Sequence, residues 1–471
     1  MVFPNTNKSH YIRIDGYSKQ IQAIFDKYNK EFAKLGLSVD YDKEKGLFYF
    51  KDFPEINKKA EKLLQKFSKE ITTAIQKGCA NEWDKANANN DLLVQSLLGK
   101  AWQDSQYSKY FNNHTKAKEA FLKRKQNGMD LSQKVWQYAG QYKENIEDCL
   151  SVGIGQGISA TKLSRQIRQY LNEPNKLFRR VRDEHGELRL SKNAKAYHSG
   201  AGVYRSSYKN AMRLARTEIN MAYRYADYER WKDMDFVLGI KIQLSDAHPK
   251  YDICDVLQGE YPKDFKFGGW HPHCLCFATP ILQSDKDFIA GKQPKPITEL
   301  PKNFKDWYEF HKDQIQIATE KGKLPYFLRD NKGVIYKQEV KNAINEVYDY
   351  IKEIQANGEN TFTSENLATG KMELSYRIAK DFVQKKHTKS IAEKTLLLEI
   401  GNNLQNLSIV PNSFVPLDMN KPKNNLQTKI NRDVIGYRKY EYTANNGNIY
   451  ILLFENRKDY EVPYCVLTKK R

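Results

Sequence analysis

The sequence Gly268-Gly269-Trp270-His271-Pro272-His273-Cys274-Leu275-Cys276, called the knuckle below, places two histidines and two cysteines close together behind a glycine pair. A third cysteine, Cys254, lies just upstream. Thiolates and imidazoles are the ligands with which proteins hold zinc in tetrahedral sites. Because Cys274 and Cys276 are two positions apart, their side chains point the same way in an extended segment. We therefore predict that this part of the chain folds around a metal site.

The predicted ligand set is Cys254, His271, Cys274 and Cys276, since Pro272 can turn His271 back toward the thiols. Four such ligands close a tetrahedral site and leave no position for a catalytic water, so a structural zinc is predicted. The reserve ligands are His248, Asp252 and His273. If one of them replaces a thiolate, or if only three ligands bind, the ion could hold a water and hydrolyse a substrate. Buried thiols without a metal are the remaining alternative.

The bulk composition is that of a globular protein: 471 residues, 40% hydrophobic and 28% charged, long enough for two to four domains. We expect no membrane partner, because no apolar run reaches the length of a membrane span. The first residues lack a basic-then-apolar signal pattern, so we expect a protein that is made and kept in a cytoplasm. Six cysteines are too few for a disulfide framework in a chain of this length.

The formal net charge of +20 favours polyanionic partners, namely DNA, RNA or an acidic protein surface. The basic residues concentrate in one segment, where aromatic side chains interleave them. Such a segment can follow a phosphate backbone and stack on bases, although a solvated loop is the more ordinary interpretation. The predicted contact residues are Arg179, Arg180, Arg182, Arg189 and Lys192.

Apolar spacing predicts a mainly helical α+β fold. Predicted helices cover residues 15–36, 55–81, 91–105, 115–126, 131–152, 160–171 (with Ser159 as N-cap), 207–232, 303–323, 337–356 and 372–407. Predicted strands cover 236–244 and 277–282, followed by an extended linker over 283–301. Three more strands, 434–442, 448–454 and 462–468, form an antiparallel meander with a hairpin at Asn446-Gly447. The predicted domains are 1–129, 130–285, 286–340 (linker and helix) and 341–471.

The helix over 207–232 carries Arg216-Thr217-Glu218. The neighbours of Glu218 three and four positions away are all apolar, so its carboxylate is expected to be buried. A buried carboxylate is costly unless it is paired or hydrogen-bonded. We therefore expect a partner from another part of the fold, either an arginine or lysine or the amides of a loop, rather than a catalytic role.

These residues together resemble the head-morphogenesis domain of tailed phages, found in minor head proteins of the phage Mu F type. The resemblance rests on Arg216-Thr217-Glu218, on His248, Asp252-x-Cys254 and Gly259, and on His271-Pro-x-Cys274-x-Cys276, with Leu275 where the family often has arginine. The resemblance covers about residues 130–285. The sequence around Gly202 is also similar to that of family members from phages and prophages of the Bacteroides group.

The resemblance implies a virion protein present in few copies, which acts at the portal in head morphogenesis or in DNA packaging and delivery. Its partners would be the portal protein, other capsid proteins and packaged DNA, and it would occupy the host cytoplasm during assembly. It does not imply an enzyme. We expect Arg216, Thr217 and Glu218 to make packing and polar contacts beside the knuckle.

Members of this family often carry an additional C-terminal domain, sometimes a toxin or nuclease. Residues 372–471 are similar in pattern to small ribonuclease-like toxins of the barnase–colicin–RelE type, so a phage-delivered nuclease is the alternative function. Lys386 or His387 would then act as acid or base, with Arg438 and Tyr440 holding phosphate. Such a Lys386-His387 pair is more often a solvated helix end, where cations complement the helix dipole, and no motif decides the assignment.

Overall fold

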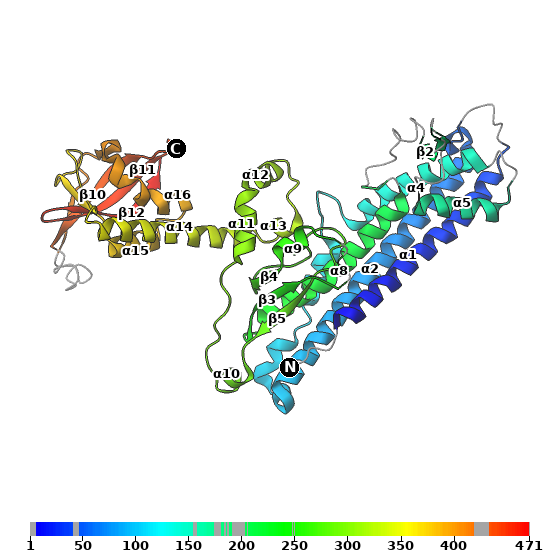
Figure 1. The fold of residues 1–471 in the computed structure, drawn as a ribbon, viewed down its shortest axis with the longest axis horizontal. Helices are drawn as coiled ribbons and strands as arrows, with labels where there is room; N and C mark the ends of the chain where they lie inside the picture. The colour runs from blue at the N-terminus through cyan, green and yellow to red at the C-terminus, as the bar shows by residue number, and fades with distance from the viewer. Residues whose placement is uncertain are drawn as a thin grey trace. The chain divides into compact units, whose positions relative to one another are not determined.

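The structure is a computed structural model that describes residues 6–40, 47–153, 158–173, 180–182, 185, 188–190, 203–204, 206–246, 248, 250–418 and 433–470. The chain divides into two compact units, Met1–Asn331 and Lys332–Arg471 (Figure 1). Helices dominate the first unit, and the second combines helices with a sheet, which confirms the predicted mainly helical α+β class. Within the described residues, no helix has both the length and the apolarity needed to cross a membrane.

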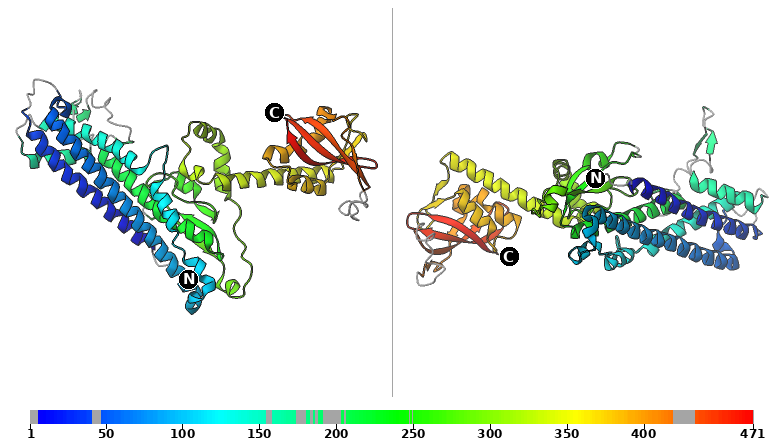
Figure 2. Two further views of the ribbon diagram at one scale, coloured as in Figure 1. Left: turned by 180° about the vertical axis from the view of Figure 1, so that it is seen from behind. Right: turned by 90° about the horizontal axis from the view of Figure 1, so that it is seen from below.

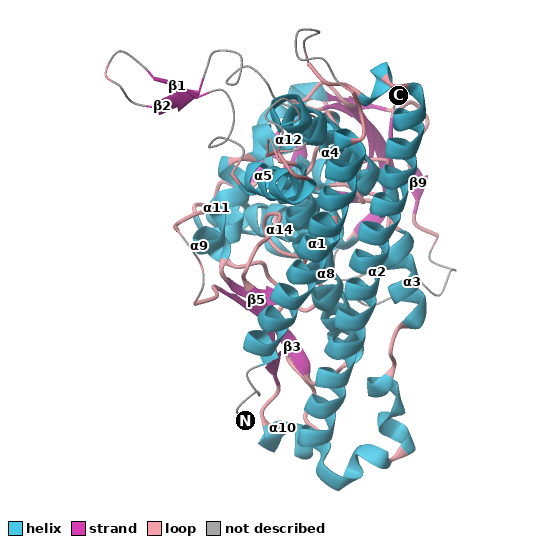
Figure 3. Cartoon of the chain, turned by 90° about the vertical axis from the view of Figure 1, so that its right-hand side faces the viewer, coloured by secondary structure: helices cyan, strands magenta, loops and turns pink. Residues whose placement is uncertain are grey.

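Long helices form most of the first unit. They are α1 (Thr6–Leu37), α2 (Pro54–Leu98), α4 (Leu131–Gly153), α5 (Ala160–Asn172) and α8 (Ser207–Asp233), with α3 (Thr115–Lys123) and the 3₁₀ turns η2 (Phe50–Asp52), η3 (Gly99–Gln103) and η4 (Ser105–Phe111) between them. Helices α1, α2 and α8 lie side by side along much of their length (Figures 2 and 3). One core joins them, with the Phe67 ring 4.9 Å from Phe25 and 4.5 Å from Tyr142. The boundary expected at 129/130 therefore falls inside a shared core.

Helix α2 replaces two predicted helices, 55–81 and 91–105, because the chain stays helical across the asparagine-rich stretch between them. The buried stripe continues through that stretch at Trp83 and Ala86. The asparagines bond to other elements instead of breaking the helix, since Asn90 Nδ2 donates to Asp227 Oδ1 of α8 at 2.7 Å. At the start of α5, Ser159 Oγ accepts from the backbone N–H of Lys162, which confirms the predicted N-cap.

A small antiparallel sheet carries the knuckle. Its central strand β3 (Val237–Gln243) pairs with β4 (Gly259–Pro262) on one side and with β5 (Phe277–Leu282) on the other. The short helix α9 (Ile253–Leu257) precedes β4, and the knuckle connects β4 to β5. The predicted strands 236–244 and 277–282 are thus confirmed within one or two residues.

The segment predicted as a linker is packed onto the first unit. The N–H of Ile297 donates to the carbonyl of Leu238 in β3 at 2.7 Å, so the extended chain runs along the sheet. Helices α10 (Asp285–Ile289), α11 (Lys302–Phe310), α12 (Lys312–Glu320) and α13 (Tyr326–Arg329) follow. The predicted helix 303–323 is two helices that meet at His311. The first unit therefore continues to residue 331, beyond the boundary expected at 285/286.

The second unit begins with α14 (Lys332–Ala356) and contains a mixed sheet in the order β6 (Thr361–Thr363), β7 (Lys371–Glu373), β12 (Glu461–Lys469), β11 (Ile449–Arg457), β10 (Val434–Thr443), β8 (Leu407–Ile409), with β9 (Val415–Pro416) also on β10. Strands β10, β11 and β12 form the predicted antiparallel meander. Gly447 has φ +77° in the predicted hairpin turn. The second unit has an apolar core of its own, which includes Val347, Phe382 and Leu452.

The prediction of one helix over residues 372–407 is wrong. The segment contains the end of β7, α15 (Tyr376–Gln384), α16 (Ile391–Lys394), the 3₁₀ turns η6 (Thr395–Leu398) and η7 (Ile400–Asn406), and the start of β8. Two serine caps divide it, because Ser375 Oγ accepts from the N–H of Ile378, and Ser390 forms a capping box with Glu393. The apolar spacing was compatible with one long helix, but the caps start two short ones.

The predicted basic contact segment is described only in part. Strands β1 (Arg180–Arg182) and β2 (Leu188–Leu190) form an antiparallel ladder in which Val181 pairs with Arg189. Arg179 and Lys192 lie outside the described residues, as do the side chains of Arg180, Arg182 and Arg189. The contact with nucleic acid or portal therefore stays a prediction.

Candidate metal centre

Three buried thiols meet where α9 and the knuckle come together. The sulfur atoms of Cys254, Cys274 and Cys276 all lie within 4.8 Å of one another, and each residue is at most 1% exposed. The Cys254 and Cys274 sulfurs are 3.7 Å apart. A tetrahedral zinc with Zn–S bonds of about 2.3 Å places its sulfur ligands roughly 3.8 Å from each other. The cluster therefore has the composition and spacing to hold a metal ion.

His271 lies at the edge of this cluster. Its Nε2 is 3.2 Å from Cys254 Sγ, and its Nδ1 is 3.0 Å from the carbonyl oxygen of Pro272. Because a carbonyl only accepts, this contact requires Nδ1–H as donor and leaves the lone pair on Nε2, on the side of the thiol. His271 is not within 4.8 Å of all three sulfurs, so the three-thiol group does not include it. Of the three thiols, His271 contacts that of Cys254.

Two of the three reserve ligands lie beside the thiols. His248, Asp252 and Cys254 also have ligand atoms within 4.8 Å of one another. Asp252 Oδ1 accepts from the N–H of Cys254 at 2.7 Å as the N-cap of α9, while its Oδ2 lies 3.4 Å from His271 Nε2. His248 Nε2 is 2.9 Å from Asp255 Oδ2. Cys254 therefore belongs both to the group of three thiols and to the group with His248 and Asp252.

His273, the third reserve ligand, contacts α8. Its φ of +63° turns the chain so that its N–H donates to Thr217 Oγ1 at 3.0 Å, and its Nε2 lies 3.2 Å from the guanidinium of Arg216. Burial and the charge of Arg216 lower the pKa of His273, which keeps Nε2 an acceptor for that guanidinium. This arrangement disfavours His273 as a ligand.

The triad Arg216-Thr217-Glu218 joins α8 to four other segments. Arg216 Nε donates to Ser18 Oγ of α1 at 2.8 Å, and Thr217 Oγ1 accepts a hydrogen bond from the N–H of His273 in the knuckle. The carboxylate of Glu218 is 4% exposed and accepts from the Arg124 guanidinium and from Lys134 Nζ at 3.2 Å. Both partners of Glu218 come from outside its helix, which is the kind of pairing that the sequence led us to expect.

Arg224 is the functional residue that the sequence analysis missed. Its guanidinium is buried in α8 and donates to three carbonyl oxygens: Gly268 at 2.9 Å, Cys274 at 2.8 Å and Cys276 at 2.6 Å. Hydrogen bonds with Cys254 and Cys276, together with the charge of Arg224, lower the pKa of the Cys274 thiol. A lowered pKa favours the thiolate, which is the form that binds metal. The only sequence signal was a second arginine about two turns after Arg216.

A group of aromatic rings packs beneath the knuckle. The Trp270 ring lies 5.8 Å from Tyr261, 5.9 Å from Phe265 and 5.4 Å from Phe327. Phe304 of α11 lies 5.8 Å from Phe265. The knuckle therefore rests on an apolar core, which the sequence analysis did not anticipate although the aromatic residues are evident at these positions.

Gly269 has a conformation that other residues rarely adopt. Its φ is +113°, and a Cβ built there would lie 2.6 Å from Arg224 Nη1. We expect Gly269→Ala to destabilise the first unit by roughly 2–4 kcal/mol through backbone strain and displacement of the guanidinium. Urea unfolding of the full chain measures this. Gly140→Ala in α4 is the control, because nothing lies within 4 Å of its added methyl group and alanine favours the helix. Equal unfolding free energies for both variants would contradict the prediction.

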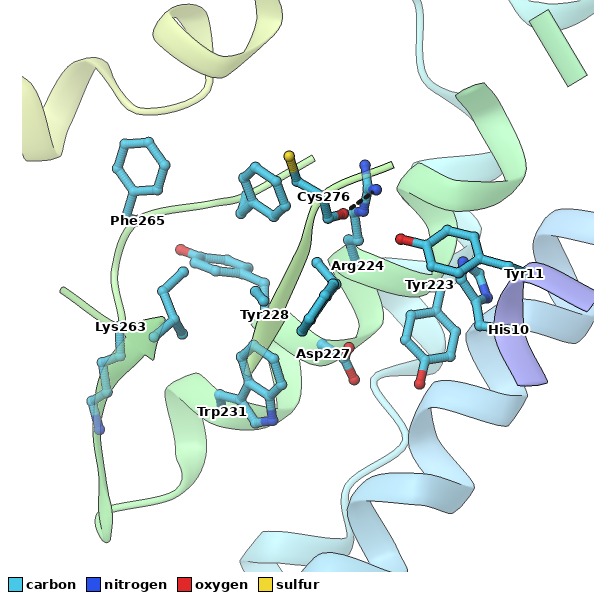
Figure 4. Close-up of a pocket in the computed structure, with 14 residues that line it drawn as sticks. His10, Tyr11, Tyr223, Arg224, Asp227, Tyr228, Trp231, Lys263, Phe265 and Cys276 are labelled. Atoms are coloured by element: carbon cyan, nitrogen blue, oxygen red, sulfur yellow. Dashed lines mark hydrogen bonds between the residues drawn. The ribbon is translucent and has the colours of Figure 1, made fainter. Parts of the chain in front are cut away.

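A cavity of about 20 Å³ lies between the knuckle, α1 and α8 (Figure 4). Its lining includes His10, Tyr11, Tyr223, Arg224 and Asp227. Such a volume holds about one or two water molecules, so it is not a substrate pocket. Asp227 is buried there, and this burial raises the pKa of its carboxyl to about 8.

The raised pKa of Asp227 predicts a pH dependence of stability. The folded chain holds the proton more tightly than the unfolded chain, whose aspartates titrate near pH ~4, so stability falls as the pH rises from about 4 to about 8. Asp227→Asn mimics the protonated carboxyl, and we expect it to raise the unfolding free energy by roughly 2–5 kcal/mol at pH ~9 and little at pH ~4. Urea unfolding at both pH values checks this. The exposed Asp246→Asn should leave the pH dependence unchanged, and a parallel shift at both pH values would refute the assignment.

The residues suggested for catalysis in the second unit come from two elements: Arg438 and Tyr440 lie in β10, and Lys386 and His387 follow α15. Lys386 and His387 are exposed on the turn after α15. Tyr440 is fully buried, and its hydroxyl donates to Glu461 Oε2 at 2.6 Å and accepts from the N–H of Ala368 at 2.9 Å. Arg438 lies over the Phe414 ring at 5.0 Å. Among the described residues, no hydrogen bond or ion pair links the first two residues to Arg438 or Tyr440.

Comparison of the chain with protein-family models, with curated proteins and with solved structures found no match. The resemblance to phage head-morphogenesis proteins therefore stays an expectation from the motif residues of the sequence.

Proposed function

We propose that this chain is a minor head protein of a tailed phage or prophage, which assembles at the portal vertex and acts in head morphogenesis or in DNA packaging and delivery. One observation carries the proposal: the two halves of the motif are in direct contact. The N–H of His273 donates to Thr217 and its ring accepts from Arg216, although 56 and 57 residues separate these pairs in the chain. The contact runs through His273, the position that the motif leaves open between Pro272 and Cys274, so it supports the proposal by bringing the two halves of the motif together in space.

We infer that the metal at this contact is zinc and that its role is structural. The ligands would be Cys254, His271, Cys274 and Cys276, the set closest to a complete tetrahedron. Zinc would supply cross-links between α9 and the knuckle. Arg224 donates to the carbonyl oxygens of Cys274 and Cys276, and Thr217 accepts from the N–H of His273. Helix α8 would therefore hold the backbone of the knuckle while the metal holds its side chains.

Mass spectrometry of purified phage particles tests the proposed function. The chain should copurify with capsid and portal proteins in a small number of copies, and immunogold labelling should mark one vertex of each head. A chain that is abundant in the infected cell but missing from particles that contain portal protein would contradict the proposal.

A specific observation keeps the nuclease alternative open for the second unit. The Glu461 side chain is fully buried against Tyr440 and Asn456, and burial raises the pKa of its carboxyl. The buried Nε of neighbouring Arg438 has no hydrogen-bond partner in the structure. A carboxyl group beside an arginine can serve acid–base chemistry on a phosphate.

Expression of residues 332–471 in a bacterium separates the two functions, since this unit has its own core. A purely structural role predicts normal growth and intact RNA. Growth arrest with RNA cleavage that disappears in Glu461→Gln would establish the nuclease instead. Lys386→Gln with His387→Gln is the second comparison, because loss of cleavage there would assign the chemistry to the exposed turn.

A further inference from the structure

We propose that the knuckle binds a second divalent metal ion, held by His248, Asp252 and a Cys254 thiolate shared with the first ion. This inference rests on the proposed metal site at the three thiols. Ligand atoms of these three residues all lie within 4.8 Å of one another, in a group distinct from Cys254, Cys274 and Cys276. A mixed set of imidazole, carboxylate and thiolate suits zinc or another borderline divalent ion.

The number of ligands exceeds what one ion can use. A structural zinc takes four ligands, and the three thiols with His271 supply them. His248 and Asp252 would then remain unused, although both are near Cys254. A thiolate sulfur has more than one lone pair, so Cys254 can bind two ions at once. His271 Nε2, which lies 3.2 Å from Cys254 Sγ and 3.4 Å from Asp252 Oδ2, stands between the two positions.

The groups around the second position are already oriented. Asp252 Oδ1 is fixed as the N-cap of α9, which leaves its Oδ2 available. His248 Nε2 lies 2.9 Å from Asp255 Oδ2 and 3.8 Å from Asp252 Oδ1, so the ring is held between these two carboxylates. Carboxylates commonly orient metal-bound imidazoles in this way. The His248 side chain is 12% exposed, which limits competition from solvent.

The local charge also favours two ions. A metal ion binds thiols as thiolates, so once the first ion is bound Cys254, Cys274, Cys276, Asp252 and Asp255 would all be negative. Arg224 supplies one positive charge to the knuckle, while Arg216, the other arginine that contacts it, is already paired with Asp15 at 3.3 Å. Two divalent ions balance the remaining four negative charges, whereas one ion leaves two uncompensated in a mostly buried loop. Like charges held this close are destabilising without counterions.

Metal content of the purified full chain tests the proposal. After loading with zinc and removal of free metal, elemental analysis should find about two zinc ions per chain. His248→Gln and Asp252→Asn should each reduce this to about one, because each removes a ligand of the second position alone. Asp252→Asn retains a helix-capping oxygen, so its loss of metal cannot be attributed to a lost cap. His273→Gln is the matched control in the same loop and should retain both ions.

Titration of the metal-free chain with cobalt(II) gives a second measurement that does not depend on a folded variant. Two binding steps, both changing the thiolate-to-cobalt absorption, are expected because Cys254 contacts both ions. One zinc per chain, unchanged in His248→Gln, would overturn the second position and leave the first intact. No bound zinc at all would overturn both this inference and the proposed structural site.

Discussion

Replacement of both Cys274 and Cys276 by serine is expected to abolish zinc binding and to lower the unfolding free energy of the first unit by several kcal/mol. Zinc contributes roughly 10–16 kcal/mol to isolated zinc-finger peptides, which have little other core. The loss should be smaller here, because the knuckle also rests on Trp270 and its aromatic neighbours and is held by Arg224. Elemental analysis and thermal unfolding, each with and without chelator, measure the two effects.

Cys465→Ser is the control for this double variant. Cys465 is equally buried but lies alone in β12 of the second unit, so its loss should leave the metal content unchanged. The chelator should destabilise the native chain and have no further effect on the double variant. A native chain that contains no metal, and whose stability equals that of the double variant, would contradict the zinc proposal.

The cysteine cluster could be predicted from the sequence because much of the constraint is local. Cys274 and Cys276 share one side of an extended segment, and Pro272 reverses the chain beside them, so spacing alone brings candidate ligands together. The meander of the second unit was predictable for the same reason, since alternation and the Asn446-Gly447 turn define strands without reference to distant residues.

Contacts made through the backbone could not be predicted in this way. Arg224 binds the carbonyl oxygens of Gly268, Cys274 and Cys276, and every residue has a carbonyl, so no side-chain pattern marks the acceptors. The same limit applies to residues 283–301. This segment lies along the sheet because the N–H of Ile297 donates to the carbonyl of Leu238. In α2, the asparagines between the two predicted helices lie in one continuous helix, and Asn90 bonds to Asp227, more than a hundred residues away.

Arg224→Met is expected to destabilise the first unit by about 3–5 kcal/mol, the usual cost of removing one partner from a buried charged network. Methionine fills a similar volume but donates no hydrogen bond, so three buried carbonyl oxygens lose their donor. The thiolate at Cys274 also loses its nearby positive charge, so bound zinc should be released to a chelator faster. Arg224→Lys should recover only part of the stability, because one ammonium group cannot reproduce the planar guanidinium fork.

Lys209→Met separates this effect from the general loss of a positive charge on α8, since Lys209 is exposed on the same helix. It should change the unfolding free energy by less than about 0.5 kcal/mol and leave zinc release unaltered. Urea unfolding and the rate of zinc transfer to a chromogenic chelator provide the comparison. If Arg224→Met and Lys209→Met behave alike in both measurements, the guanidinium does not support the knuckle. If only zinc release differs between them, Arg224 acts on the thiolates rather than on the carbonyls, because lost carbonyl bonds would also lower the unfolding free energy.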